Sequence, residues 1–345
     1  MRVQRLPTPR GPISAALLEA LVEAPGALGP LDVPRPDDPL ADEDLHLALY
    51  LCYELHYRGL PGVDERWEWN PGLLGVRAAL EERFECGLIE TVPRPAPVPA
   101  EAMDEALREI ADEDGPSLSR HLEREATLEQ FREFVVHRSA YQLKEADPHS
   151  WALPRLDGPP KAALVEIQFD EYGSGRASRM HAALYAQTME EMGLNASYGA
   201  YVDVIPAFTL ATVNLMSLFG LHRRRRGAIV GHLALFEMTS SLPNRRYARG
   251  ARRMGFGDRA CAFFDEHVMA DAVHEAIAAV DLAGGLAARE PAVAGDVLWG
   301  AAALAELDRR FAEALLGAWE AGRSSLRAGT GLRKYAPLRE SPITA

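Results

Sequence analysis

Two histidines and an aspartate recur at helical spacing near the end of the sequence, as His267, Asp271 and His274. At about 100° per residue these positions fall within about 60° of one another, so their side chains project from one stripe of a helix. Two imidazoles and a carboxylate on one stripe can bind a metal ion. Taken alone, the triple is more typical of a polar helix face in contact with water than of a metal site.

The neighbours of this stripe favour the metal site. They are aromatic or aliphatic: Phe263, Phe264, Val268 and Ile277. This predicts that the helix is embedded, and buried ionisable side chains need partners or a metal to be tolerated. Facing helices in metal-binding bundles supply ligands to one another, so we expect further ligands elsewhere in the chain.

Two upstream segments carry suitable side chains. Glu145 lies near the end of one predicted helix, Glu171 just before a glycine break, and His181 in the helix that follows. Singly, Glu145 is more typical of a solvated helix-end residue, and His181 of a core histidine with ordinary partners. Together with the stripe they make three histidines and three carboxylates. That set suits iron or manganese and is sufficient for two metals with one bridging carboxylate.

Three motifs in a fixed order carry a resemblance to a known family. They are Leu143-Lys-Glu145-Ala-Asp-Pro148, then Asp170-Glu171-Tyr-Gly followed by Met180-His181, then Phe264-Asp-Glu-His267 followed by Asp271 and His274. Over about residues 120–320 the sequence resembles the haem-oxygenase-like diiron oxidases, also called the iron-containing redox enzyme family. The resemblance implies a haem-oxygenase-like fold without haem, and two Fe(II) ions per chain that use O2 as co-substrate.

The same resemblance implies a division of the ligands between the two irons. One iron would be held by Glu145, Glu171, His181 and His274. The second would be held by His267 and Asp271, with Glu171 bridging.

The sequence departs from the family pattern at one position. Members that oxygenate amine nitrogens carry an extra carboxylate three residues before the histidine that corresponds to His181, where this chain has Ser178. A hydroxyl is a poor iron ligand beside a carboxylate, so we expect the second iron to be labile. We therefore expect hydrogen abstraction from carbon in place of N-oxygenation.

The expected substrate is a small molecule, a free aliphatic amino acid. It would be desaturated, with or without cyclisation to an azetidine, in specialised-metabolite (antibiotic) biosynthesis, and an external electron donor would be needed. The alternatives that stay open are N-oxygenation of an amino-acid amine, and oxidative C–C cleavage or decarboxylation. Glu237, in an apolar segment, is either a partner of the metal ligands or substrate amine, or a polar core residue.

The elements that position these residues are predicted to be helices. Apolar residues recur every three or four positions and strand-like alternation is absent, so the fold class is all-α: a haem-oxygenase-like helical bundle with an additional N-terminal helical region. The predicted helices are 13–24, 42–57, 70–84, 100–112, 119–124, 128–144, 160–172, 177–192, 202–219, 228–240, 247–254, 259–282 and 292–321. We expect 1–118 to form the N-terminal region, 119–322 the oxidase domain and 323–345 a flexible C-terminal tail.

Composition bounds the remaining possibilities. The net charge of −13 disfavours nucleic-acid partners, and the run His222–Arg226 is more typical of a solvated helix end than of a phosphate-binding patch. Three widely spaced cysteines fit neither a disulfide framework nor a zinc site, and no apolar stretch is long enough to span a membrane. These features favour a cytoplasmic protein, and the N-terminal helices could form a homodimer surface. The non-enzyme alternative is a helical binding protein with a hydrated polar stripe.

Overall fold

The computed structural model describes residues 5–112 and 115–327, without the side chains of residues 270–272. Its described residues contain helices and no strand, which confirms the all-α prediction. The α-helices are α1 (Pro12–Leu21), α2 (Glu43–Glu54), α3 (Pro71–Thr91), α4 (Met103–Ala111), α5 (Leu118–Arg124), α6 (Leu128–Gln142), α7 (Asp147–Ser150), α8 (Gly158–Glu171), α9 (His181–Glu191), α10 (Ala207–Leu221), α11 (Arg226–Met238), α12 (Ser241–Arg253), α13 (Asp258–Ala276), α14 (Gly285–Arg289) and α15 (Ala294–Glu320).

Short helical elements join these helices. The 3-10 turns are η1 (Glu65–Trp69), η2 (Ala100–Ala102), η3 (Leu153–Arg155), η4 (Gly173–Gly175), η5 (Ala177–Arg179), η6 (Arg223–Arg225) and η8 (Pro291–Val293), and η7 (Ile277–Gly284) is a π-helix. The expected helix 259–282 therefore continues beyond Ala276 as a π-helix. The expected helix 177–192 begins only at His181, after η4 and η5. The expected helix 202–219 begins at Ala207, because Pro206 occupies its N-cap.

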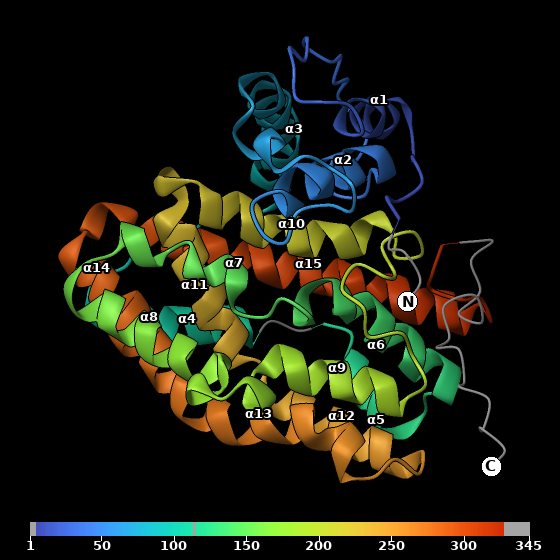
Figure 1. Cartoon of the computed structure of the whole chain (residues 1–345). Helices are drawn as coiled ribbons and strands as arrows, with labels where there is room; N and C mark the ends of the chain where they lie inside the picture. The colour runs from blue at the N-terminus through green and yellow to red at the C-terminus, as the bar shows by residue number, and fades with distance from the viewer. Residues whose placement is uncertain (1–4, 113–114, 328–345) are drawn as a thin grey trace, which may run out of the picture.

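Two glycines hold α11 against α15 in the middle of the bundle (Figure 1). A Cβ at Gly231 would lie 1.8 Å from the carbonyl oxygen of Val297, and one at Gly300 would lie 2.1 Å from that of Ala228. Only glycine permits the two backbones to approach so closely. This contact fixes the position of α11, which carries Glu237 near its end.

The helix α13 crosses the lower layer of the molecule in Figure 1 and packs against α9, α11 and α12. Its π-helical continuation η7 packs against α8. One continuous helical element thus passes the start of α9 and then the end of α8. The helix α6 contacts α9 and α10, so the segment that ends α6 also lies among these elements.

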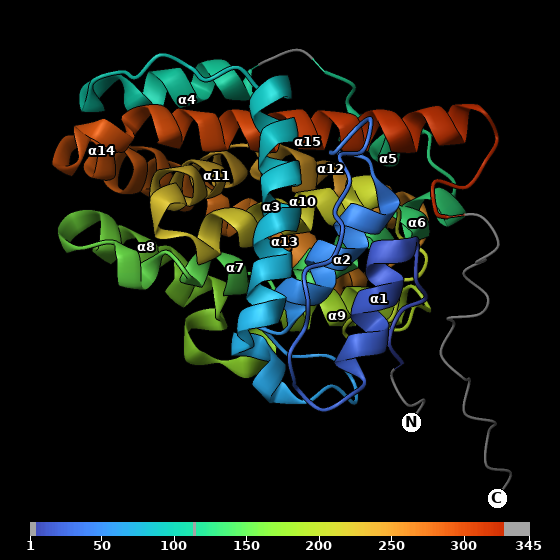
Figure 2. The ribbon, with the colours of Figure 1, turned by 90° about the horizontal axis from the view of Figure 1, so that it is seen from above.

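The N-terminal helices α1, α2 and α3 lie on α10, through contacts of α2 with α10 (Figures 1 and 2). The helix α4 is apart from them and lies along α15 and η7, as the view from above shows (Figure 2). The proline-rich stretch from Pro93 to Pro99, which separates α3 from η2, is not helical. The apolar residues of α1–α3 join those of the remaining helices in one core cluster.

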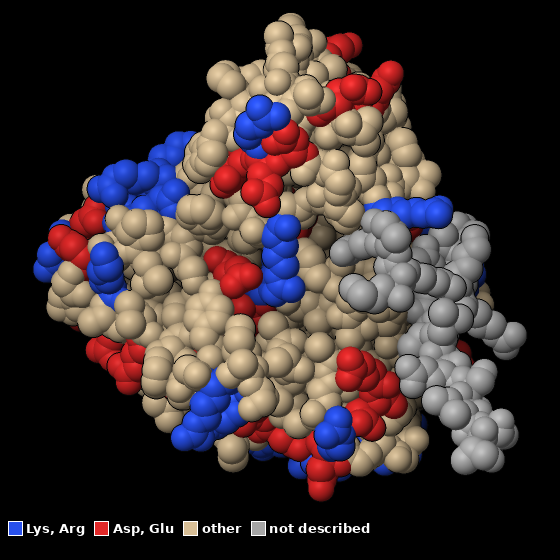
Figure 3. All heavy atoms as spheres, in the orientation of Figure 1, with Lys and Arg blue, Asp and Glu red and all other residues tan. Residues whose placement is uncertain are grey.

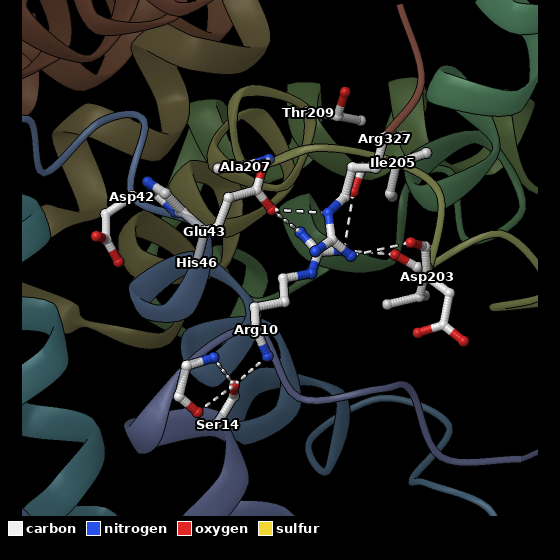
Figure 4. A network of polar contacts seen from close by, with 12 residues as sticks. Arg10, Ser14, Asp42, Glu43, His46, Asp203, Ile205, Ala207, Thr209 and Arg327 are labelled. Carbon is white, nitrogen blue, oxygen red and sulfur yellow. Dashed lines mark hydrogen bonds and ion pairs between the residues drawn. The ribbon is translucent and has the colours of Figure 1, made fainter. Parts of the chain in front are cut away.

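A polar network fastens the N-terminal segment to the rest of the chain (Figure 4). Arg10 donates hydrogen bonds to Glu43 of α2 (2.7 Å) and to the carbonyl oxygens of Val202 (2.6 Å) and Ile205 (2.8 Å). Arg327 lies 3.3 Å from the same Glu43 carboxylate. The two ends of the described chain therefore meet at one acidic side chain.

The expected C-terminal tail begins with residues that are packed. Ser325 donates from its backbone N–H (2.8 Å) and its hydroxyl (2.7 Å) to Glu133, and Leu326 is buried. The buried Glu133 carboxylate requires these donors, so residues 323–327 belong to the helical body. The rest of the expected tail, 328–345, lies outside the described residues.

Three arginines of the run His222–Arg226 pair with acidic side chains: Arg224, Arg225 and Arg226. Arg224 and Arg225 both contact Glu85 of α3, at 2.5 and 2.6 Å. Arg225 also reaches Asp296 of α15 at 2.7 Å. This run therefore joins α3 to α15. On the face of the molecule that Figure 3 shows, basic and acidic side chains lie in small separate groups. Within residues 5–112 and 115–327, no helix combines the length and apolarity needed to cross a bilayer.

Candidate metal centre

Four buried side chains converge where α6, α8, α9 and α13 meet. Glu145, Glu171, His181 and His267 each offer one nitrogen or oxygen atom, and these atoms all lie within 4.8 Å of one another. His267 Nε2 lies 3.4 Å from Glu145 Oε1, and His181 Nδ1 lies 2.9 Å from Glu171 Oε2. We call these four residues the first group.

A second group adjoins the first and shares one of its members. Glu171, Glu237 and His274 also offer ligand atoms within 4.8 Å of one another, and all three are buried. His274 Nδ1 lies 3.5 Å from Glu237 Oε2 and 3.9 Å from Glu171 Oε1. The carboxylate of Glu171 therefore stands between the two groups.

A glycine allows Glu171 and His181 to meet. Glu171 is the last residue of α8 and His181 the first of α9, and Gly173 lies in the turn between them with φ of +70°. A Cβ at Gly173 would lie 2.5 Å from the backbone nitrogen of Met180. Glycine tolerates both the left-handed conformation and the close approach, so the chain can fold back at this point.

Glu145 is placed by the turn that follows α6. The helix α6 ends at Gln142, and Ala146, the residue after Glu145, has a left-handed backbone with φ of +72° that turns the chain into α7. Gln168 of α8 donates a hydrogen bond to the Ala146 carbonyl oxygen at 2.9 Å. This bond fixes the turn against the helix that carries Glu171.

The two histidines of α13 each have one ring nitrogen committed to an acceptor. His267 Nδ1 lies 2.8 Å from the carbonyl oxygen of Phe263, which can only accept, so Nδ1 carries a proton and Nε2 is the ring nitrogen directed at the first group. His274 Nε2 lies 3.3 Å from Asp170 Oδ2. A carboxylate there favours the proton on Nε2 and leaves Nδ1 toward the second group, an arrangement typical of metal-binding histidines.

Burial and neighbouring charge act on the ionisation of these groups. Burial raises the pKa of the Glu145 carboxyl. Burial opposes ionisation of Glu171 as well, but His181 and His267 lower the pKa of Glu171 to about 2. Burial would lower the pKa of His274, but Glu237 and Asp170 raise it to about 9. In the metal-free chain, protons on imidazoles supply the positive charge that these carboxylates attract, and binding of a metal would release them.

Several buried nitrogen and oxygen atoms of the two groups lack a hydrogen-bond partner among the described residues and could bind a cation. Glu145 Oε2 and His274 Nδ1 have no hydrogen-bond partner among the described residues. His181 Nδ1 is near Glu171 but too far out of line for a hydrogen bond. The donors are nitrogen and oxygen, and the cysteines Cys52, Cys86 and Cys261 belong to neither group. Mixed imidazole and carboxylate donors suit iron, so the residues fit an iron site.

The structure groups the predicted ligands differently from what the resemblance implied. His267, and not His274, lies with Glu145 and His181, while His274 lies with Glu171 and Glu237. His267 and His274 are seven positions apart, which corresponds to about 10 Å along a helix axis and explains why one helix serves both groups. Asp271 lies between them in α13, but its side chain is outside the described part of the chain.

Glu237 is the candidate ligand that sequence reasoning did not assign. Its signal was a single carboxylate near the end of the otherwise apolar helix α11. Ser178, which replaces an expected carboxylate, is exposed in η5 and belongs to neither group. The carboxylate of the second group therefore comes from a different helix.

The chain matches the model of a known protein family. The model of the family described as "Iron-containing redox enzyme" matches residues 132–309, a range that spans more than half of the chain and contains both groups. This family is haem-oxygenase-like, and the all-α structure agrees with it. No curated protein matches the sequence significantly.

Proposed function

We propose that this chain, which belongs to the iron-containing redox enzyme family, is an O2-dependent oxidase that holds two irons and removes hydrogen from an aliphatic amino acid. One observation carries the proposal: Glu171 is shared by two buried groups of nitrogen and oxygen donors. A carboxylate can bridge two metals, so adjoining groups that share one favour a two-iron site over two independent sites.

Each iron would have its own ligands. The first would bind Glu145, His181 and His267, the second Glu237 and His274, and Glu171 would bridge. Asp271, from the family pattern, is a further proposed ligand of the second iron. Iron in such a site supplies, with O2, the oxidising power to break an unactivated C–H bond.

The protein side chains orient the ligands and exclude water. The hydrogen bond from His267 to the Phe263 carbonyl fixes the ring, and Asp170 does the same for His274. Phe263 also packs against the His267 ring, with centroids 4.3 Å apart. This burial keeps bulk water from the ligands and strengthens their electrostatic interaction with a bound cation.

The proposed reaction balances with an external electron donor. Desaturation removes two hydrogen atoms from the substrate, and two further electrons and two protons complete the reduction of O2 to two waters. Ring closure to an azetidine forms a C–N bond at the expense of one C–H and one N–H bond, so it removes the same two hydrogens. A place in specialised-metabolite biosynthesis follows if such a ring is the product.

The test is to load the protein anaerobically with Fe(II), add a reductant and O2, and measure product masses against a panel of amino acids and fatty acids. We expect loss of two hydrogens from an aliphatic amino acid, with proton NMR separating alkene from azetidine. Addition of oxygen to the amine would identify an N-oxygenase, and a shortened product would identify oxidative cleavage.

Two variants test the assignment of the site. His267→Ala should abolish turnover while helicity is retained, because it removes a ligand and leaves the apolar core. Ser178→Ala should leave turnover unchanged, since Ser178 is exposed and outside both groups. Iron-independent turnover, or full activity of the His267 variant, would overturn the proposal.

A further inference from the structure

A cavity of about 110 Å³ lies beside the first group, and the His267 side chain forms part of its wall. Much of the remaining wall is aromatic, including Tyr185, Phe236, Phe263 and Phe264. An engineered apolar cavity of roughly 150 Å³ binds benzene, so this space is suited to a compact apolar group and not to a long acyl chain. A substrate placed here would have its apolar part next to a candidate iron ligand.

The same cavity is lined by an ion pair. Arg138 of α6 donates one hydrogen bond, from Nη2 to Asp308 Oδ1 of α15, at 3.1 Å. The side chains are 22% and 35% exposed, so the pair is open to solvent in part. The Arg138 guanidinium lies 4.4 Å from the centre of the Phe311 ring, and this cation–π contact holds it in place.

Most of the hydrogen-bonding capacity of this ion pair is unused. Among the described residues, Arg138 donates only to Asp308, and Asp308 accepts only through Oδ1. An arginine can bind a carboxylate through two parallel N–H groups, and the second carboxylate oxygen of Asp308 can accept from an ammonium. A partly exposed ion pair with a single hydrogen bond contributes little to stability, so a ligand can open it or share it.

Gln142 adds an acceptor to this polar end. It lines the cavity one turn after Arg138 on α6, about 6 Å further along the helix axis, and Glu145 of the first group follows three residues later. The Oε1 atom of Gln142 is buried and has no hydrogen-bond partner among the described residues. A buried acceptor of this kind calls for a donor on a bound molecule.

We propose that Arg138 and Asp308, with Gln142, bind the charged head group of a free α-amino acid. Arg138 takes the carboxylate, Asp308 and Gln142 Oε1 take the ammonium, and the side chain points along the aromatic wall toward His267. The opposite charges of the ion pair match those of a zwitterion, whereas a fatty acid would leave Asp308 beside a second anion. This inference rests on the proposed function for the substrate class and adds the residues that select it.

The experiment measures equilibrium binding without oxygen, by calorimetry on the full chain. The probes are L-valine, L-isoleucine and L-leucine, their amides, which lack the carboxylate, and the matching carboxylic acids without the amine. We expect at least one amino acid to bind about 10- to 100-fold more tightly than its amide and than the matching carboxylic acid, because each lost charge removes a charge-assisted hydrogen bond.

Variants then assign each half of the ligand to its residue. Arg138→Gln should abolish the preference for the amino acid over its amide. Asp308→Asn should abolish the preference for the amino acid over the matching carboxylic acid. Arg309→Gln is the control, because Arg309 lies next to Asp308 on α15 but pairs with Glu306 and Glu313 outside the cavity. It should leave both preferences intact. If Arg138 and Asp308 had only a structural role, each substitution would weaken the binding of all three types of probe equally, and neither preference would be lost selectively.

The possible outcomes separate this inference from the proposed function. Equal binding of the three probe types, or no binding of any amino acid, overturns the inference, and if Fe(II) is still taken up, the two-iron proposal stands. Selective amino-acid binding without Fe(II) uptake supports the inference and defeats the proposed function. If a variant fails to fold, the comparison of probes on the unaltered chain still distinguishes selective from unselective binding.

Discussion

Lys144 and Glu145 are consecutive and both are buried, yet their surroundings are opposite in kind. Lys144 donates to Glu54 of α2, whose other oxygen accepts from Tyr198, and its ammonium lies 4.1 Å from the centre of the Tyr57 ring. Glu145 has an oxygen with no hydrogen-bond partner among the described residues. The hydrogen-bonding needs of the first buried charge are met within the chain, whereas one oxygen of the second is left without a donor, and we propose that this oxygen binds iron.

This contrast distinguishes buried charges that stabilise the fold from buried charges that we propose bind the metal. Buried charges in folded proteins are paired or bind metals. The Lys144–Glu54 pair ties the N-terminal helices to the segment that carries Glu145, so it supports the site without belonging to it. The two regions should therefore respond differently to substitution, to pH and to iron.

The largest expected effect comes from breaking the compensated pair. Glu54→Gln leaves the Lys144 ammonium buried without a counter-ion, which costs about 3–5 kcal/mol of unfolding free energy. The loss should be the same with and without Fe(II). Urea unfolding of the iron-free protein measures it.

A double variant provides the control for this loss. Glu54→Leu with Lys144→Met removes both charges and should recover most of the stability, since uncharged replacement of a buried pair is often neutral. A single variant as stable as the unaltered chain would contradict the idea that this region is self-compensated.

The second effect is the pH dependence of the unfolding free energy that arises from the N-terminal helices. Burial lowers the pKa of His46 in α2 to about 4. Between pH 6.5 and about 4 the unfolded chain binds a proton at this residue and the folded chain does not. The unfolding free energy therefore decreases as the pH is lowered from 6.5 to about 4, and His46 does not change it above pH 6.5. The loss from His46 should be on the order of 3 kcal/mol.

Unfolding of the iron-free protein at pH 7 and pH 4 measures this dependence. His46→Gln should show a smaller loss between the two conditions than the unaltered chain. An identical loss in both proteins would show that His46 is not the group responsible.

The third effect is stabilisation by iron. Fe(II) at about 100 times its dissociation constant should raise the unfolding free energy by roughly 2.7 kcal/mol, because only the folded chain has the assembled site. Glu145→Gln should lose this gain while the iron-free stability stays equal or rises, since burial opposes ionisation of that carboxyl. Anaerobic thermal unfolding with and without Fe(II) tests both statements. A Glu145→Gln protein that is still stabilised by Fe(II) would contradict the assignment.

The smallest change expected is in iron stoichiometry. Glu237→Gln should weaken the second iron and lower the bound iron from two to one per chain. Ser178→Glu, at an exposed position outside both groups, should leave the stoichiometry unchanged. Anaerobic titration followed by metal analysis distinguishes the two variants. Recovery of a tightly held second iron only in the Ser178→Glu protein would restore the family's usual position as the ligand.

The sequence predicted which helix faces carry the site, but not how they meet in space. Helical periodicity placed His267 and His274 on one stripe, which the structure confirms as buried, yet periodicity carries no information on which neighbours each histidine faces. Their separate groups result from the different heights of α9 and α8 along α13 and η7.

The sequence did not identify Glu237 as a metal ligand for a related reason. An isolated carboxylate on an apolar helix has many possible partners, and only packing decides among them. The close approach of α11 to α15 through Gly231 and Gly300 fixes that helix, a long-range consequence that local patterns do not reveal. The turns at Gly173 and Ala146, by contrast, lie where glycine and proline marked helix ends in the sequence.

The most direct test of the two-iron account is an anaerobic Fe(II) titration of the unaltered chain beside Glu171→Ala. The account predicts about two Fe(II) per chain, and severe loss of both in the variant, because Glu171 is the ligand that the two groups share. Uptake of no iron by the unaltered chain, or of two equivalents by the variant, would contradict it.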